Sequence, residues 1–141
     1  DAIKQQERVD KGEGGTLADI PMALPSLSRA YKLQKRAASV GFDWTNPKDV
    51  LAKVKEEIAE LEVEIAKGDR LAMEDEMGDL LFSCVNLARH LSIDPEKAMR
   101  LSSNKFKRRF EAMELLAAGE TFSTMTAAEM ESLWSRVKAQ E

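Results

Sequence analysis

The sequence predicts an all-α protein, a four-helix-bundle-like core with an additional short C-terminal helix. Apolar residues recur at three- and four-residue spacing along several segments, and no segment alternates with a period of two. The chain is rich in Lys, Glu, Ala, Leu and Arg, a composition that favours helices. Its 141 residues, 43% of them hydrophobic, are enough for one domain with a core.

The chain divides into a lead-in and a helical domain. Residues 1–20 are charged and Gly-rich without a sustained apolar period, so we expect a linker or a partly ordered lead-in. Residues 21–141 form the predicted domain. Its first helix begins near Pro25 and ends before Gly41, a suitable C′ residue. The loop that follows holds Phe42 and Trp44, which either plug one end of the core or line a pocket.

The next two helices are separated by a short break at residues 67–69. The second begins at Asn46-Pro47, a cap followed by a first helical position. Its expected apolar seam consists of Leu51, Val54, Ile58, Leu61 and Ile65. The third helix contains Gly78, which costs about 1 kcal/mol relative to Ala. Either a close helix approach or room for a ligand would explain this glycine.

The last two helices also carry clear end signals. The fourth begins at Asp94-Pro95 and ends before Gly119. Thr126 and Glu129 have the spacing of a capping box, which opens the fifth helix.

Four acidic residues have a spacing that brings them together. Glu57 and Glu60 on the second helix, and Glu76 and Asp79 on the third, are each three residues apart and share a helix face. Two antiparallel helices joined by a short turn would bring these faces together. Four carboxylates without His or Cys suit Mg²⁺, with Mn²⁺ as a substitute. The alternative is a solvated acidic face paired with lysines such as Lys53.

Other polar residues near this cluster have less defined roles. Glu56 lies about 100° round the helix from Glu57 and is a second metal ligand, a water activator or a surface charge. Asn86 continues the polar stripe of the third helix, and we expect it to contact substrate. The acidic residues predicted to be solvated are Glu62, Glu64, Glu74 and Asp75.

The fourth helix carries a basic face. Lys105, Arg108 and Arg109 lie at i, i+3 and i+4, and side chains of this kind bind phosphate oxygens. The alternative is a solvated basic face. A P-loop is excluded, because the sequence has no G-x-x-x-x-G-K-[ST] motif.

Composition also limits the setting of the protein. The net charge of -4 argues against nucleic acid as the main partner. The single Cys84 cannot form an internal disulfide, so we expect a small core residue and a cytoplasmic location. No apolar run approaches the roughly 20 residues of a membrane span, so no membrane partner is expected.

These motifs together resemble a known family. Glu56-Glu57-x-x-Glu60 followed by Glu76-x-x-Asp79 is similar to the EExxE…ExxD signature of the all-α NTP pyrophosphatases. Residues 24–44, 74–91 and 104–110 resemble the C-terminal domain of MazG, a bacterial member of this superfamily. The lead-in GEGGTLADIP resembles the linker after the N-terminal domain of MazG, which implies a fragment of a longer parent chain.

The resemblance implies a Mg²⁺-dependent pyrophosphohydrolase that converts nucleoside triphosphates to monophosphate and pyrophosphate, and a homodimer. It implies catalytic roles for Glu56, Glu57, Glu60, Glu76 and Asp79, of which the last four would bind the metal. The residues that it implies for substrate binding are Lys53, Glu56, Lys105, Arg108, Arg109 and Trp134. Base and sugar preference stay open.

Three other functions remain as alternatives. The chain could be a catalytically silent helical dimerisation module, or an enzyme of narrow specificity similar to dUTPases or dCTPases. Residues 100–109 could also form a helix that binds nucleic acid, although the net charge and the paired acidic motifs oppose this.

Overall fold

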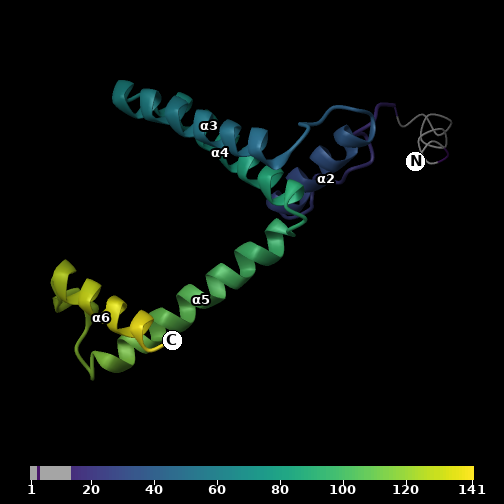
Figure 1. Ribbon diagram of the computed structural model, residues 1–141. Coiled ribbons are helices and arrows are strands. Elements are labelled where there is room, and N and C mark those ends of the chain that lie inside the picture. Colours follow the sequence, from purple (N-terminus) through teal and green to yellow (C-terminus); the bar gives the residue numbers. More distant parts are fainter. Residues whose placement is uncertain (1–2, 4–13) are drawn as a thin grey trace. The chain divides into compact units, whose positions relative to one another are not determined.

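The computed structural model describes Ile3 and residues 14–141 (Figure 1). Most of the predicted lead-in, residues 1–2 and 4–13, lies outside the described residues. The described α-helices are α2 (Ser26–Ser39), α3 (Pro47–Lys67), α4 (Arg70–His90), α5 (Pro95–Leu116) and α6 (Ala127–Ala139), with a 3₁₀ helix, η1 (Phe122–Thr124). This part of the chain contains no strand. The predicted all-α fold class is confirmed.

Several helices begin or end at the capping residues that the sequence predicts. The Asn46 side chain accepts a hydrogen bond of 3.0 Å from the Asp49 N–H, and Pro47 is the first residue of α3. Thr126 and Glu129 form the predicted capping box of α6. Gly41 has a φ of 97°, the left-handed conformation that suits a glycine after a helix. Local sequence therefore determines most helix boundaries.

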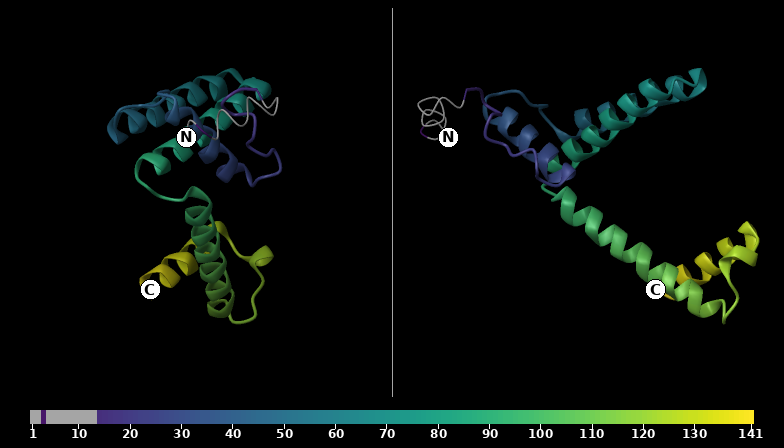
Figure 2. Two further views of the ribbon diagram at one scale, coloured as in Figure 1. Left: turned by 90° about the vertical axis from the view of Figure 1, so that its right-hand side faces the viewer. Right: turned by 180° about the vertical axis from the view of Figure 1, so that it is seen from behind.

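The fold consists of two compact units, and each is described by itself. Unit 1 runs from Asp1 to Glu96 and contains α2, α3 and α4, whereas unit 2 runs from Lys97 to Glu141. In unit 1, α3 and α4 are joined by two residues and lie antiparallel side by side, and α2 packs against α4 (Figure 2). The predicted four-helix core requires helices of both units and stays a prediction.

The buried side of α3 differs from the predicted seam. The residues that are buried on α3 are Val50, Val54, Glu57 and Leu61. Val54 and Leu61 thus lie inside as predicted, but Leu51, Ile58 and Ile65 are 42%, 42% and 58% exposed. Val50 and Glu57, each one residue earlier, are buried in place of Leu51 and Ile58, and no buried residue of α3 takes the place of Ile65. Helix α3 therefore carries a second apolar row that unit 1 does not bury.

Two expectations for α4 are also corrected. Cys84 is exposed, because the buried residues of α4 are Ser83, Val85 and Asn86. A Cβ atom added at Gly78 would meet no described atom within 4 Å. A close helix approach within the described residues therefore does not explain this glycine.

Unit 2 has a small core of its own. Met113 and Ala117, at the end of α5 and just after it, are buried with Leu133 and Val137 of α6. The apolar residues packed against this core are Ala112, Leu116, Phe122, Met125, Met130 and Trp134. None of the described helices combines the length and hydropathy needed to cross a bilayer.

Candidate functional site

Three of the predicted acidic residues meet between α3 and α4. One carboxylate oxygen each from Glu57, Glu76 and Asp79 lies within 4.8 Å of the other two. Glu57 belongs to the buried stripe of α3 and is only 5% exposed. Glu76 and Asp79 lie one turn apart on α4, as their spacing predicts. We call these three residues and the adjoining Glu60 the acidic cluster.

Glu60 lies outside the group of three but close to it. Desolvation and, after it, the neighbouring carboxylates of Glu60 and Glu57 together raise the pKa of Glu76 to about 7. Desolvation also raises the pKa of Asp79, with added effects of Asp75 and Glu57. Proton binding is favoured where negative charges crowd without enough positive charge. A cation would relieve the same repulsion.

Two buried oxygens of the acidic cluster have no hydrogen-bond partner among the residues that the structure describes. The buried atoms Glu57 Oε2 and Glu76 Oε2 accept no hydrogen bond from any described residue. Buried carboxylate oxygens in this state are costly unless a cation or a donor satisfies them. They are also hard ligands, the kind that Mg²⁺ and Mn²⁺ prefer. The donor set therefore fits a divalent cation.

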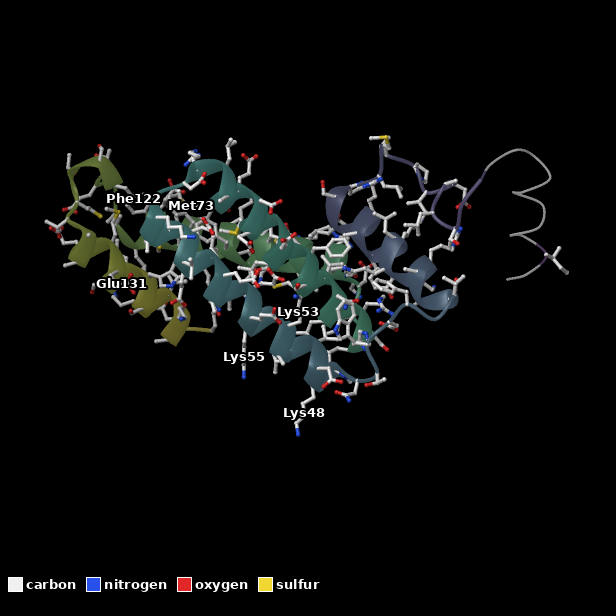
Figure 3. The ribbon with its side chains drawn as sticks, turned by 90° about the horizontal axis from the view of Figure 1, so that it is seen from above. Lys48, Lys53, Lys55, Met73, Phe122 and Glu131 are labelled. Atoms are coloured by element: carbon white, nitrogen blue, oxygen red, sulfur yellow. The ribbon has the colours of Figure 1, made fainter. Side chains whose placement is uncertain are left out.

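Lys53 lies at the rim of the acidic cluster. Its Nζ is 3.1 Å from Glu57 Oε1 and 3.3 Å from Glu56 Oε1, so it pairs with both predicted neighbours. Figure 3 shows that Lys48 and Lys55, on the same helix, point away from the body of unit 1. Glu56 itself is exposed and takes no part in the group of three.

Asn86, predicted to contact substrate, is buried in a polar network. It is 4% exposed, and its Oδ1 accepts hydrogen bonds from Arg89 Nε at 3.2 Å and Nη2 at 2.8 Å. Arg89 in turn donates to both carboxylate oxygens of Asp43, which also lies 2.9 Å from His90 Nε2. The hydrogen bonds from Arg89, and then His90, lower the pKa of Asp43 to about 2.

This network borders a cavity of about 300 Å³ within unit 1. Its lining residues are Leu17, Leu33, Gln34, Ala37, Phe42, Trp44, Phe82, Asn86 and Arg89. Phe42 and Trp44 therefore line a pocket, one of the two alternatives considered for these loop aromatics.

The predicted phosphate-binding residues lie in unit 2. Arg109 donates two hydrogen bonds of 2.7 Å to the carboxylate of Glu141, and its guanidinium lies 5.6 Å from the centre of the Trp134 ring. The hydrogen bond from Arg109 and the charges of Arg108 and Lys105 lower the pKa of Glu141. All three basic side chains of α5 thus stabilise the charge of the same carboxylate, that of Glu141. Their role toward phosphate stays a prediction.

Sequence reasoning assigned no role to three polar residues that matter here, Gln34 of the cavity and the paired Asp43 and Arg89. Gln34 did carry a signal, because it lies four residues after Ala30 and three before Ala37, a spacing that puts a polar residue on the apolar face of the first helix. Asp43 and Arg89 are 46 residues apart, and no local spacing indicates that they pair.

Comparison with known proteins places the acidic residues within a region that matches a known family. Residues 45–113, which include the acidic cluster, match a family described as MazG nucleotide pyrophosphohydrolase domain. A nucleoside triphosphate pyrophosphohydrolase of Escherichia coli K12 is 46% identical over 143 residues, covering 99% of this chain and 54% of that relative. A nucleoside triphosphate pyrophosphohydrolase/pyrophosphatase MazG of Thermotoga maritima is 40% identical over 138 residues, covering 96% and 52%.

A third relative is the uncharacterized protein YabN of Bacillus subtilis, 39% identical over 142 residues, which cover 99% of this chain and 29% of YabN. The chain spans about half the length of the E. coli and T. maritima relatives that it matches.

Proposed function

We propose, from the match of residues 45–113 to the MazG nucleotide pyrophosphohydrolase domain family, that the chain hydrolyses nucleoside triphosphates to monophosphate and pyrophosphate. The observation that supports this most is the meeting of Glu57, Glu76 and Asp79, with two buried oxygens that lack a partner. A catalytically silent helical module would have no reason to hold such a costly group of charges. The proposed setting is the cytoplasm, where nucleotides are available.

We propose that Glu57, Glu60, Glu76 and Asp79 bind Mg²⁺, with Mn²⁺ as a substitute. The unpartnered oxygens Glu57 Oε2 and Glu76 Oε2, and the raised pKa of Glu76, support this assignment. A divalent cation bound there would supply positive charge that offsets the carboxylates and lowers the pKa of a bound water.

The reaction that we propose breaks the bond between the α-phosphorus and the oxygen that bridges to the β-phosphorus. The oxygen of a water molecule forms the new bond to the α-phosphorus, and pyrophosphate leaves. Glu56 is our candidate for positioning this water, and Lys53 keeps Glu56 and Glu57 in place through its two ion pairs. Lys105, Arg108 and Arg109 would meet the charge on the leaving pyrophosphate, and Trp134 would contact substrate.

We further propose that the protein is a homodimer. The second apolar row of α3, Leu51, Ile58 and Ile65, is exposed, and Met77 and Leu81 of α4 are 44% and 49% exposed. Exposed rows of this kind mark surfaces that pair with another protein surface. A second copy of the chain is the partner that we propose for them.

The activity is tested by incubating the protein with a panel of ribo- and deoxyribonucleoside triphosphates and Mg²⁺. We expect monophosphate and pyrophosphate in equal amounts, without a diphosphate intermediate, and loss of turnover when a chelator removes the metal. Strict use of a single nucleotide would favour the narrow-specificity alternative. No turnover of any triphosphate would favour the silent module.

A further inference from the structure

The cavity of unit 1 combines aromatic walls with two polar groups whose orientation is fixed. We propose that this cavity binds the nucleobase of the substrate, and that Gln34 and Asn86 are the residues that read its hydrogen-bonding edge. The inference rests on the proposed function, because it assumes a nucleotide substrate. It adds the place of the base and the two side chains that select it.

The walls of the cavity suit a flat aromatic ligand. Phe42 and Trp44 come from the loop after α2, and Phe82 comes from α4. Aromatic rings bind a base by stacking, which every base accepts. The volume of about 300 Å³ is at the lower end of the range of small-ligand pockets.

Gln34 offers the cavity a hydrogen-bond acceptor. Its Nε2 donates a hydrogen bond of 2.9 Å to the main-chain carbonyl oxygen of Phe82, and this contact fixes the direction of the amide. The opposite orientation would place Oε1 against that carbonyl oxygen and repel it. Oε1 is buried, has no hydrogen-bond partner within Ile3 and residues 14–141, and belongs to a side chain that is only 7% exposed. A buried acceptor of this kind calls for a donor from a ligand.

Asn86 offers the cavity a donor. Its Oδ1 receives two hydrogen bonds from Arg89, a side chain that has only donors. The amide nitrogen of Asn86 therefore cannot exchange places with the oxygen, and its N–H groups remain for a ligand. Asp43 holds Arg89 through two hydrogen bonds, so the donor position is supported from the loop after α2.

An acceptor and a donor in one cavity match the edge of a nucleobase. Each standard base carries a hydrogen-bond donor beside an acceptor on its Watson–Crick edge, the edge by which proteins read an unpaired base. For adenine, the 6-amino group would donate to Gln34 Oε1, and N1 would accept from Asn86 Nδ2. This pair tolerates several bases but rejects a base that lacks the donor, because Gln34 Oε1 then stays unpaired.

The cavity also lies where a base would leave its phosphates near the acidic cluster. Asn86 follows Asp79 by seven residues on α4, which is nearly two full turns. By helix geometry the two residues lie on the same side of α4, about 10 Å apart along its axis. In a nucleotide the base is attached to C1′ of the ribose and the α-phosphate to the oxygen on C5′, so the ribose separates the two. A base in the cavity therefore directs the phosphates along α4.

The test compares the binding of AMP with that of purine riboside 5′-monophosphate, which is AMP without its 6-amino group. Calorimetry in the presence of Mg²⁺ should show AMP binding about tenfold more tightly to the wild-type chain. In Gln34→Met, which keeps the size of the side chain, we expect nearly equal binding of the two ligands. The matched control is Gln140→Met, the same substitution at an exposed position of unit 2, which should keep the wild-type ratio.

If Gln34→Met keeps the wild-type ratio, Gln34 does not read the base and the inference is wrong. Should Gln34→Met not fold, Asn86→Asp gives an independent answer. In this variant a carboxylate oxygen replaces the N–H donor that faces N1 of adenine. Two acceptors would then face each other, so AMP should bind at least about tenfold more weakly. Wild-type affinity in this variant would also overturn the inference. Binding of the monophosphates requires no turnover, so a failure of the proposed hydrolysis would be seen separately.

Discussion

At the scale of single residues, the site depends on polar groups at positions where helix packing favours apolar ones. Glu57 lies between Val54 and Leu61 in the buried stripe of α3, and Gln34 is the buried residue of α2. In the described part of the chain, each side chain has one polar atom with a partner and one without. Such groups lower the stability of the free protein, and a ligand that supplies the missing contact recovers it.

Asp79→Asn should remove most Mg²⁺ binding, because it takes one charged oxygen from the acidic cluster. The melting temperature of the metal-free variant should hold or rise, since one of several mutually repelling charges is gone. Thermal melts with and without Mg²⁺ measure both effects. Glu74→Gln is the matched control, because Glu74 is exposed on the same helix and outside the group of three.

An Asp79→Asn variant that Mg²⁺ stabilises as much as the wild type would contradict the site. Glu57→Gln is a less direct test, because it also removes the ion pair with Lys53.

The Asp43–Arg89 contact should make the free energy of unfolding depend on pH in the acidic range. The pKa of Asp43 is lowered from 3.8 to about 2 in the folded chain, so its contribution is present above pH 3.8 and is lost as the pH falls toward 2. The shift corresponds to at most about 2.5 kcal/mol, a bound that solvent screening of this partly exposed side chain lowers. Urea unfolding at pH 6 and pH 2 should show the difference between wild type and Asp43→Asn shrinking with acid. An equal difference at both pH values would mean that the contact contributes nothing.

At the scale of elements, the helices were predictable because their signals are local. The caps at Asn46 and Thr126 and the glycine after α2 each depend on residues within one turn. The buried side of α3 was predicted less well, since α3 carries two adjacent apolar rows of the same period. Spacing alone cannot tell which row faces α4.

The acidic cluster was predicted because its pattern repeats on two helices joined by a short turn. The Gln34–Phe82 and Asp43–Arg89 contacts join residues 48 and 46 positions apart. They exist only through the packing of α2 and the following loop on α4, which no spacing encodes.

Gly78→Ala should stabilise unit 1. The added Cβ would meet no described atom within 4 Å. Replacing Gly by Ala at an exposed position inside a helix raises the free energy of unfolding by about 0.5–1 kcal/mol. Gly68→Ala is the matched control: Gly68 has a φ of 71° after α3, so the same change there should destabilise by about 1 kcal/mol. Urea unfolding of both variants measures these signs. Destabilisation by Gly78→Ala would show that another surface packs closely on this face of α4.

At the scale of the whole molecule, the chain leaves apolar rows that its first unit does not bury, and the proposed homodimer covers them. Light scattering should give twice the chain mass of 15.7 kDa. Ile58→Lys should shift the protein toward monomer, because it places a charge in the exposed row of α3. Met22→Lys is the control, since Met22 is 85% exposed and lies outside α3 and α4. A wild-type chain that is monomeric and fully active at micromolar concentration would contradict the dimer.

The central claim is that water attacks the α-phosphorus of a nucleoside triphosphate. Hydrolysis of ATP in ¹⁸O-labelled water with Mg²⁺, followed by mass spectrometry of the products, tests it most directly. We predict one labelled oxygen in AMP and none in pyrophosphate. Label in pyrophosphate would mean attack at the β-phosphorus, and labelled free phosphate with ADP would mean attack at the γ-phosphorus. Either result would contradict the proposed reaction.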